Sequence, residues 1–394
     1  MLFRSVLGLA LVMLAAVLLA EALHRAWRLP RACGHMLTGA IAGPLLLNLI
    51  DLGELDRWKP LIDLAIGALL FELGTRIRPR WLVDNPWLAL GCVLQALLCG
   101  LGVMAVLMAL GAPMMSAALA GTVALATSPV IVLTATHEAR SRGQVTERLL
   151  MMTVVNSVIA VLGLKVLRVV MAADEATLGE EWLDAVTSAL RVTSGSFLLG
   201  LACGFALDRL SPLVRGTPAM PVLQIALVIT ASMLAAQWTL SPLLALLVAG
   251  MTARARMTHG LTVEPHLGSA GAVLNVLLFI AIGLLFTLGG GGLWLWALAI
   301  IAARLVGTAL AVGALARVSG LGWHQAGALT LALQPMTSLA VLVAADTFGS
   351  PSQLPGVDAT TLQALLLAIT LMQLSGPVWT RLSLKHVARE VPRG

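Results

Sequence analysis

The sequence predicts an all-α membrane protein that crosses the bilayer about thirteen times, and three observations lead to this fold class. Hydrophobic residues make up 59% of the 394 residues, charged residues only 11%, and the mean hydropathy is +0.95. Apolar runs long enough to span a bilayer as helices alternate with short polar segments. Two of these runs are broken at their midpoints by proline among small polar residues. This composition excludes a water-soluble globular protein.

The predicted helices fall into two sets of six around one linking helix, each helix ending where polar or charged residues return. The linking helix is 183–208, and it inverts the second set relative to the first. Such an arrangement is expected of inverted-topology repeats. The first set comprises 3–24, 31–50, 59–76, 86–111, 114–137 and 146–172, and the second comprises 219–238, 241–256, 267–289, 291–317, 322–347 and 359–384.

Basic residues concentrate on one side of this arrangement, which predicts its orientation because lysine and arginine favour cytoplasmic loops. Acidic residues collect on the opposite side, at Asp51, Glu54, Asp56, Asp174, Glu175, Glu180, Glu181 and Asp184. We therefore expect a multi-pass inner-membrane protein with its N-terminus outside and its C-terminus in the cytoplasm. This topology accounts for the net charge of +6, so the charge does not indicate nucleic-acid binding. The basic residues of the cytoplasmic side are Arg25, Arg28, Arg31, Arg76, Arg78, Arg80, Arg140, Arg142, Arg148, Arg209, Arg215, Arg254, Arg256, Arg317, Arg381, Lys385, Arg389 and Arg393.

The two interrupted helices are the fifth and the twelfth, which occupy the same place in each set. Their breaks are Ala126-Thr-Ser-Pro-Val130 and Leu333-Gln-Pro-Met-Thr-Ser338, centred on Pro129 and Pro335. A break at mid-membrane frees backbone N–H and C=O groups, which hydrocarbon tolerates only where they line a protein cavity or bind something. Paired breaks therefore predict a secondary transporter whose binding site lies at the interface of the repeats. A proline kink in a continuous helix is the alternative.

Three motifs of the sequence are Leu29-Pro-Arg-Ala-Cys-Gly-His-Met-Leu-Thr-Gly-Ala-Ile-Ala-Gly-Pro44, Leu69-Leu-Phe-Glu-Leu-Gly74 and Ala124-Leu-Ala-Thr-Ser-Pro129. They resemble motifs of the monovalent cation:proton antiporters, the Kef-type and Nap-type sodium/proton exchangers. The resemblance covers nearly the whole chain. It implies a sodium/proton antiporter-like fold, a homodimer in the bilayer, and exchange of a monovalent cation such as Na⁺ or K⁺ for protons.

The resemblance also implies that the single membrane domain consists of two parts with different roles. A core bundle near 86–172 and 291–384 would move against dimerisation and scaffold helices near 3–76 and 219–289, with 183–208 as the linker. About ten residues follow the last predicted helix, so the nucleotide-binding regulatory domain of many Kef-type relatives is expected to be missing.

The chain differs from this family at the residue pair that binds the cation and the proton. The family's sixth helix carries Asn-Asp or Asp-Asp, whose second aspartate binds the cation and the proton in turn, but here the pair is Asn156-Ser157. A serine hydroxyl can coordinate a cation but does not titrate near neutral pH. The predicted ion-binding residues are Asn156, Ser157, Thr127, Ser128, Gln334, Thr337, Ser338 and Arg304.

Proton coupling then needs another group, and Asp63 and Glu72 are the candidate carriers. Glu72 lies four residues before Arg76 on one helix, a spacing that also predicts a structural ion pair. Asp63 projects from roughly the opposite face of that helix. Its alternative role is that of an interfacial or packing residue.

Arg304 lies at the middle of a predicted helix with no charged residue nearby in sequence. A mid-membrane arginine needs a polar partner or a watery cavity. It could cap carbonyl groups that the breaks release, or it could face the substrate. In the second case a site without a carboxylate would be positive and would suit an anion. The alternatives to a cation antiporter are thus an anion transporter of the same fold and a homologue that does not transport.

Motifs for other chemistry are missing from the sequence. No helix carries paired carboxylates, a His-Glu zinc pattern or Gly-x-Ser-x-Gly. The four cysteines have no metal-ligand spacing and are interpreted as packing residues. We therefore expect no enzymatic activity, no cofactor, and no metal beyond the transported cation.

Overall fold

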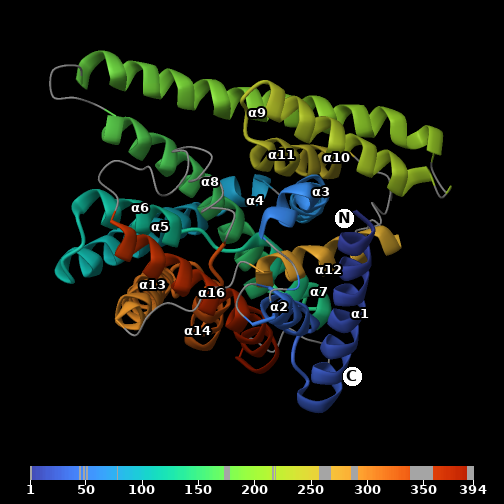
Figure 1. Cartoon of the computed structure of the whole chain (residues 1–394). Helices are drawn as coiled ribbons and strands as arrows, with labels where there is room; N and C mark the ends of the chain where they lie inside the picture. Colours follow the sequence, from blue (N-terminus) through green and yellow to red (C-terminus); the bar gives the residue numbers. More distant parts are fainter. Residues whose placement is uncertain are drawn as a thin grey trace. The chain divides into compact units, whose positions relative to one another are not determined.

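The computed structural model describes residues 2–43, 46–47, 49, 52–77, 79–172, 178–214, 217, 219–256, 268–284, 292–337 and 358–387 (Figure 1). Within these ranges the secondary structure is helical apart from one isolated antiparallel bridge. The predicted all-α polytopic fold is confirmed. The helices are α1 (Leu2–Trp27), α2 (Arg31–Ala42), α3 (Leu52–Arg76), α4 (Pro79–Asp84), α5 (Pro86–Ala109), α6 (Met114–Ala124), α7 (Pro129–Ala139), α8 (Gln144–Ala172), α9 (Leu178–Val214), α10 (Ala219–Gln237), α11 (Pro242–Arg256), α12 (Gly268–Leu284), α13 (Leu293–Leu315), α14 (Trp323–Ala332), α16 (Ala359–Leu382) and the π-helix η2 (Ser383–Val387).

Seven of the described helices are long and apolar enough to cross a membrane. Their outward faces carry large apolar side chains, including Leu18 of α1, Leu101 of α5, Val222 of α10 and Leu298 of α13, each more than half exposed. Water would not favour so many exposed apolar side chains, whereas lipid chains accept them. The bilayer is therefore the solvent of these faces.

Several helix bounds differ from those predicted. α3 begins at Leu52 rather than near residue 59, because charged residues beyond the apolar run can still be helical. α2 ends at Ala42 rather than near residue 50, just before Gly43 and Pro44. The short α4 was not predicted. The fifth predicted helix is two helices, α6 and α7, separated by a break. The twelfth begins with α14, and its predicted continuation through residues 338–347 lies outside the described residues.

The chain divides into two compact units. The first unit contains residues 1–26, 34–81 and 188–285, and the second contains 27–33, 82–187 and 286–394. The roles of a dimerisation part and a moving core stay predictions.

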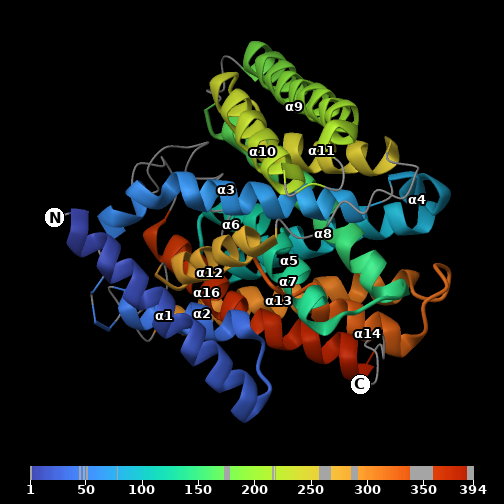
Figure 2. The same ribbon diagram turned by 90° about the vertical axis from the view of Figure 1, so that its right-hand side faces the viewer.

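The first unit has an apolar cluster at the junction of four helices. Leu70 and Phe71 of α3 pack there with Leu207 of α9, Val228 of α10 and Leu246 of α11, all nearly fully buried. Figure 2 shows α9, α10 and α11 lying together. At about 25 cal/mol per Å² of buried apolar surface, such a cluster contributes several kcal/mol where it excludes water, and in lipid it is maintained mainly by close packing.

Two helix crossings in the first unit bring backbones into direct contact at glycines. Gly74 of α3 faces Gly250 of α11, and Gly39 of α2 faces Gly283 of α12. A Cβ added at Gly250 or at Gly283 would lie 2.1 Å from a carbonyl oxygen of the facing helix. In the predicted repeat these two crossings are equivalent, because helices 2 and 10 correspond to helices 9 and 3. The matching glycines therefore support the inverted repeat.

Replacing Gly250 with alanine is expected to lower the thermal stability of the protein in detergent. The added methyl group would collide with the Phe71 carbonyl oxygen of α3 and force the helices apart, at a cost of about 1–3 kcal/mol. Size-exclusion chromatography after heating would measure the shift in Tm. Gly327→Ala is the matched control, since no atom lies within 4 Å of its added Cβ. Equal Tm values for the two variants would contradict the close crossing.

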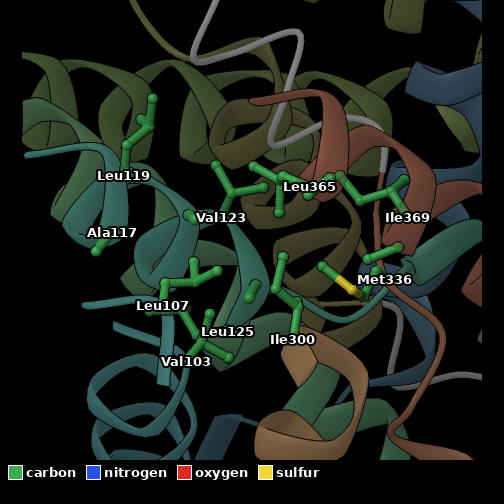
Figure 3. Packing of buried hydrophobic residues seen from close by; sticks show 14 of the residues in the cluster. Val103, Leu107, Ala117, Leu119, Val123, Leu125, Ile300, Met336, Leu365 and Ile369 are labelled. Atoms are coloured by element: carbon green, nitrogen blue, oxygen red, sulfur yellow. The ribbon is translucent and has the colours of Figure 1, made fainter. Parts of the chain in front are cut away.

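The core of the second unit lies among α5, α6, α13 and α16. Figure 3 shows Val103 and Leu107 of α5 with Val123 of α6, Ile300 of α13 and Leu365 of α16 in one buried cluster. α5 and α13 touch closely where Gly307 of α13 meets α5, since an added Cβ would lie 2.7 Å from the Leu98 carbonyl oxygen and 2.9 Å from the Cys99 backbone. This contact fixes the register of α5 against α13.

Candidate ion-binding site

The two breaks lie side by side in the second unit. Thr127 and Met336 form an antiparallel bridge, and the Ser128 N–H donates to the Pro335 carbonyl oxygen at 2.8 Å. α6 ends at Ala124 and α14 ends at Ala332, so both helices stop where the two breaks meet. This meeting point of the two breaks is called the crossing below. The prediction of a broken fifth helix that meets the other break is confirmed, and the alternative of a continuous kinked helix is wrong for the fifth.

The local sequence explains how α7 restarts after the first break. Pro129 occupies the first helical position, where its missing N–H would have no intrahelical partner in any case. The Ser128 side chain accepts a hydrogen bond from the Ile131 N–H at 3.4 Å and caps the helix. Ser128 thus caps its own helix, and its predicted place among the ion ligands stays a prediction.

Arg304 of α13 is fully buried, and its donors point at the crossing. Its Nη2 donates to the Leu333 carbonyl oxygen at 2.8 Å and to Thr127 Oγ1 at 3.1 Å. Its Nε lies 3.3 Å from the Gln334 carbonyl oxygen. Three of the five N–H donors of a guanidinium are therefore used on groups of the two breaks. This geometry is the capping role, in which arginine satisfies carbonyls that a broken helix releases.

The charge of Arg304 is offset by the ends of helices. The C-termini of α6 and α14 both meet the crossing, and a helix C-terminus carries roughly −0.5 of an elementary charge. Two such ends sum to about −1 beside one guanidinium, although the N-terminus of α7 adds roughly +0.5 back. The crossing is therefore much less positive than an isolated buried arginine would make it.

α8 brings Asn156 and Ser157 to the same crossing. Ser157 Oγ donates to the Thr153 carbonyl oxygen at 2.8 Å and also lies 3.5 Å from the Thr127 carbonyl oxygen. Asn156 is fully buried, and its Nδ2 donates to Gln95 Oε1. Among the described residues its Oδ1 has no hydrogen-bond partner.

A second buried amide oxygen lies next to the other break. Gln334 is 5% exposed, and its Nε2 donates to the Thr330 carbonyl oxygen at 2.9 Å. Its Oε1 is without a hydrogen-bond partner in the described part of the chain. Thr337 is also buried, whereas Ser338 lies outside the described residues.

The sequence analysis missed Gln95 of α5 and Thr308 of α13, which belong to this cluster. Gln95 Nε2 donates to Thr308 Oγ1 at 3.3 Å, and both residues are fully buried. Cys99 of α5 adjoins them, with Sγ 3.9 Å from Arg304 Nη1 and 3.9 Å from the Ala124 carbonyl oxygen. The available signal was a lone amide within the apolar run 86–109, a placement that needs a buried partner.

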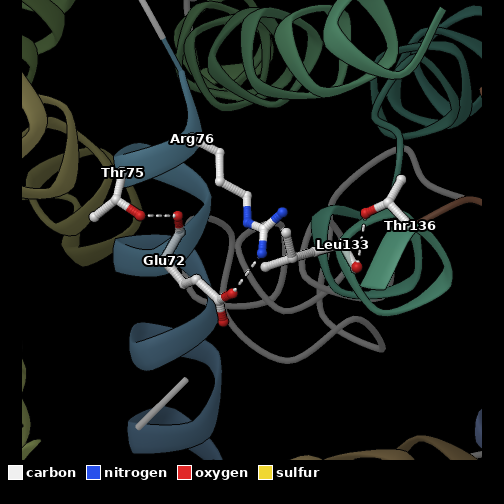
Figure 4. Close-up of polar contacts among 5 residues, drawn as sticks. All are labelled: Glu72, Thr75, Arg76, Leu133 and Thr136. Carbon is white, nitrogen blue, oxygen red and sulfur yellow. Dashed lines mark hydrogen bonds and ion pairs between the residues drawn. The ribbon is translucent and has the colours of Figure 1, made fainter. Parts of the chain in front are cut away.

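The two candidate proton carriers are in the first unit, whereas the crossing is in the second. Glu72 Oε1 accepts from Arg76 Nη2 at 3.3 Å, as Figure 4 shows, so the predicted ion pair is present. The Thr75 hydroxyl donates to the Glu72 carbonyl oxygen at 2.7 Å. Asp63 is exposed on α3.

No group of three or more histidine, cysteine, aspartate or glutamate side chains that could hold a metal ion occurs within the described ranges. All four cysteines are free and buried. The oxygen atoms at the crossing come instead from neutral amide, hydroxyl and backbone groups.

The comparisons with known proteins agree with this fold. The transmembrane sodium/hydrogen exchanger family matches residues 10–384, so the chain belongs to the sodium/hydrogen exchanger family. The structure is similar to the sodium proton antiporter MjNhaP1 from Methanocaldococcus jannaschii determined at pH 8, with a TM-score of 0.71 and 16% sequence identity over 98% of this chain and 99% of that one. A map of the same antiporter from electron microscopy gives a TM-score of 0.68 at 16% identity, with the same coverage of both chains. No curated protein sequence matches the chain.

Proposed function

We propose that the chain is a secondary transporter that exchanges a monovalent cation, Na⁺ or K⁺, for protons through a site of neutral oxygens. The observation that carries this proposal is the pair of buried amide oxygens, Asn156 Oδ1 and Gln334 Oε1, which lack hydrogen-bond partners among the described residues. A buried acceptor left unpaired costs about 1–3 kcal/mol, so it calls for a partner. A dehydrated monovalent cation binds such oxygens, as the carbonyl rings of potassium channels do.

The site geometry favours a cation over the anion alternative. An anion would need free N–H donors, but Arg304 directs three of its donors to Thr127 and to the carbonyls of Leu333 and Gln334. The unpaired atoms of Asn156 and Gln334 are acceptors rather than donors. Ser157 follows Asn156 in α8, and its Oγ lies 3.5 Å from the Thr127 carbonyl oxygen. These two oxygens would complete the ligand set.

Proton coupling is the second half of this proposal. The described groups at the crossing include no carboxylate, so the proton is assigned to Glu72 or Asp63 of α3. Glu72 is the stronger candidate for two reasons. Its side chain is 15% exposed, and its carboxylate can form the ion pair with Arg76 again after it has released a proton. Inner-membrane placement, an external N-terminus, a cytoplasmic C-terminus and a homodimer belong to the same proposal and rest on the charge pattern and the family.

The test is flux in proteoliposomes that carry a pH gradient and a pH-sensitive dye. Adding Na⁺, K⁺ or Li⁺ is expected to dissipate the gradient, and Asn156→Leu is expected to abolish the response because it removes a ligand oxygen at similar volume. Gln224→Leu is the matched control, a buried amide of α10 in the first unit, and it should leave the flux unchanged. If an anion gives an Arg304-dependent response and none of the three cations gives a response, the transported ion is an anion rather than a cation. If folded protein responds to none of the ions, the chain is better explained as a homologue that does not transport.

A further inference from the structure

Three buried polar side chains, Thr308, Gln95 and Asn156, form a hydrogen-bonded series, here called the polar relay. Gln95 Nε2 donates to Thr308 Oγ1 at 3.3 Å, and Gln95 Oε1 accepts from Asn156 Nδ2. The polar relay thus links α13, α5 and α8.

The orientation of the Gln95 amide follows from its two contacts. Its Nε2 donates to Thr308 Oγ1, so the atom that it presents to α8 is Oε1, which can only accept hydrogen bonds. The group of Asn156 that meets this oxygen is therefore its NH₂ group.

We propose that Gln95 is a positioning residue, which holds the Asn156 amide so that its oxygen rather than its NH₂ group faces the cation. If the Gln95 amide turned over, two NH₂ groups would face each other across α5 and α8. With Gln95 in place, Asn156 must present its Nδ2 to α5, and its Oδ1 is the atom left without a partner. The inference rests on the proposed function, because it assigns a cause to the ligand geometry of that site.

The hydrogen bonds of the polar relay involve no charged group, so the polar relay can act in a site that lacks a carboxylate. Gln95, Thr308 and Asn156 are each 0% exposed, so water does not compete for their hydrogen bonds. In metal sites, loss of a residue that orients a ligand typically lowers metal affinity by about 10–100-fold. Because Gln95 would act through Asn156 rather than on the ion, its loss should weaken binding more than turnover.

The experiment measures the cation dependence of transport for Gln95→Met, Thr308→Val and the double variant in proteoliposomes, with cation-dependent shifts in Tm as an independent measure of binding. We expect the KM for the cation to rise about tenfold in Gln95→Met, with the maximal rate within about twofold of the parent. Thr308→Val should raise the KM in the same direction, and Thr308→Ser should restore it because the hydroxyl is kept. The double variant should match Gln95→Met alone, since members of one relay are not additive.

Cys92→Ala is the matched control, one turn earlier on α5 and equally buried. It should leave both the KM and the cation-dependent Tm shift unchanged. An unchanged KM in Gln95→Met, a fall in maximal rate alone, or additive effects of the two substitutions would overturn the positioning role while leaving the cation site in place. A parent protein that shows neither cation flux nor a cation-dependent Tm shift would overturn the proposed function and this inference together.

Discussion

Replacing Ser157 with aspartate is expected to increase cation-dependent proton exchange by at least about tenfold at limiting cation concentration. The new carboxylate would lie beside the Thr127 carbonyl oxygen and Asn156, where it would add a charged oxygen ligand and a group that takes up protons. A carboxylate at 4 Å from a cation contributes about 4 kcal/mol at an effective dielectric constant of 20, part of which Arg304 offsets. Dissipation of a pH gradient by Na⁺, K⁺ or Li⁺ measures the effect.

Ser157→Asn is the control for the change in volume and polarity, and it is expected to leave the proton dependence as in the parent. A new pH dependence of the cation KM should appear only with the carboxylate. The opposite result, in which Ser157→Asp removes an existing anion flux and gives no cation response, would show that the crossing works as an anion site.

The second large effect is expected for Arg304→Ala, which should remove transport and lower the Tm substantially. The substitution removes the charged donor from the Leu333 and Gln334 carbonyl oxygens and from Thr127 Oγ1, although the Thr127 hydroxyl still donates to the Leu333 carbonyl oxygen at 3.1 Å. A buried acceptor left unpaired costs about 1–3 kcal/mol, and a lost hydrogen bond to a charged group costs about 1.5–3 kcal/mol, so the total is several kcal/mol. Expression level and thermal unfolding in detergent would be measured together with flux.

Two further variants separate capping from simple packing. Arg304→Lys should recover only part of the stability, because an ammonium group cannot reproduce the planar fork of donors. Arg191→Ala removes an exposed arginine of α9 that donates to Thr239 Oγ1 at 3.2 Å, and it should have little effect. A stable, fully active Arg304→Ala protein would contradict the capping role.

The sequence alone predicted the features that depend on local chemistry. A proline among small polar residues in an apolar run has few explanations other than a break, and the structure shows one before Pro129 and the end of α14 before Pro335. The isolation of Arg304 within a long apolar run predicted a buried polar partner, and the carbonyls at the crossing provide it. Its role toward substrate, like that of the other site residues, stays a prediction.

The parts that the sequence did not reveal depend on contacts between distant helices. Gln95 and Thr308 meet only because α5 and α13 pack in one register, which no local pattern encodes. Residue correspondences between the two sets of helices were also not visible in the sequence. Thr153 and Thr370 both donate to the carbonyl four residues earlier, and each precedes by three residues a buried amide, Asn156 or Gln373. Two pairs of residues over two hundred positions apart are too short a match to detect without a structure.

The contact of Gly307 with the backbone of Leu98 and Cys99 has a consequence for how the site would work. No side chain lies between the two helices at that point, so α5 cannot slide along α13 without a collision of backbones. Gln95 and Thr308 therefore travel together whenever the surrounding helices rearrange. An ion that enters from one face of the membrane would meet the same amide orientation as an ion that enters from the other, and only the path to the site would differ between the two.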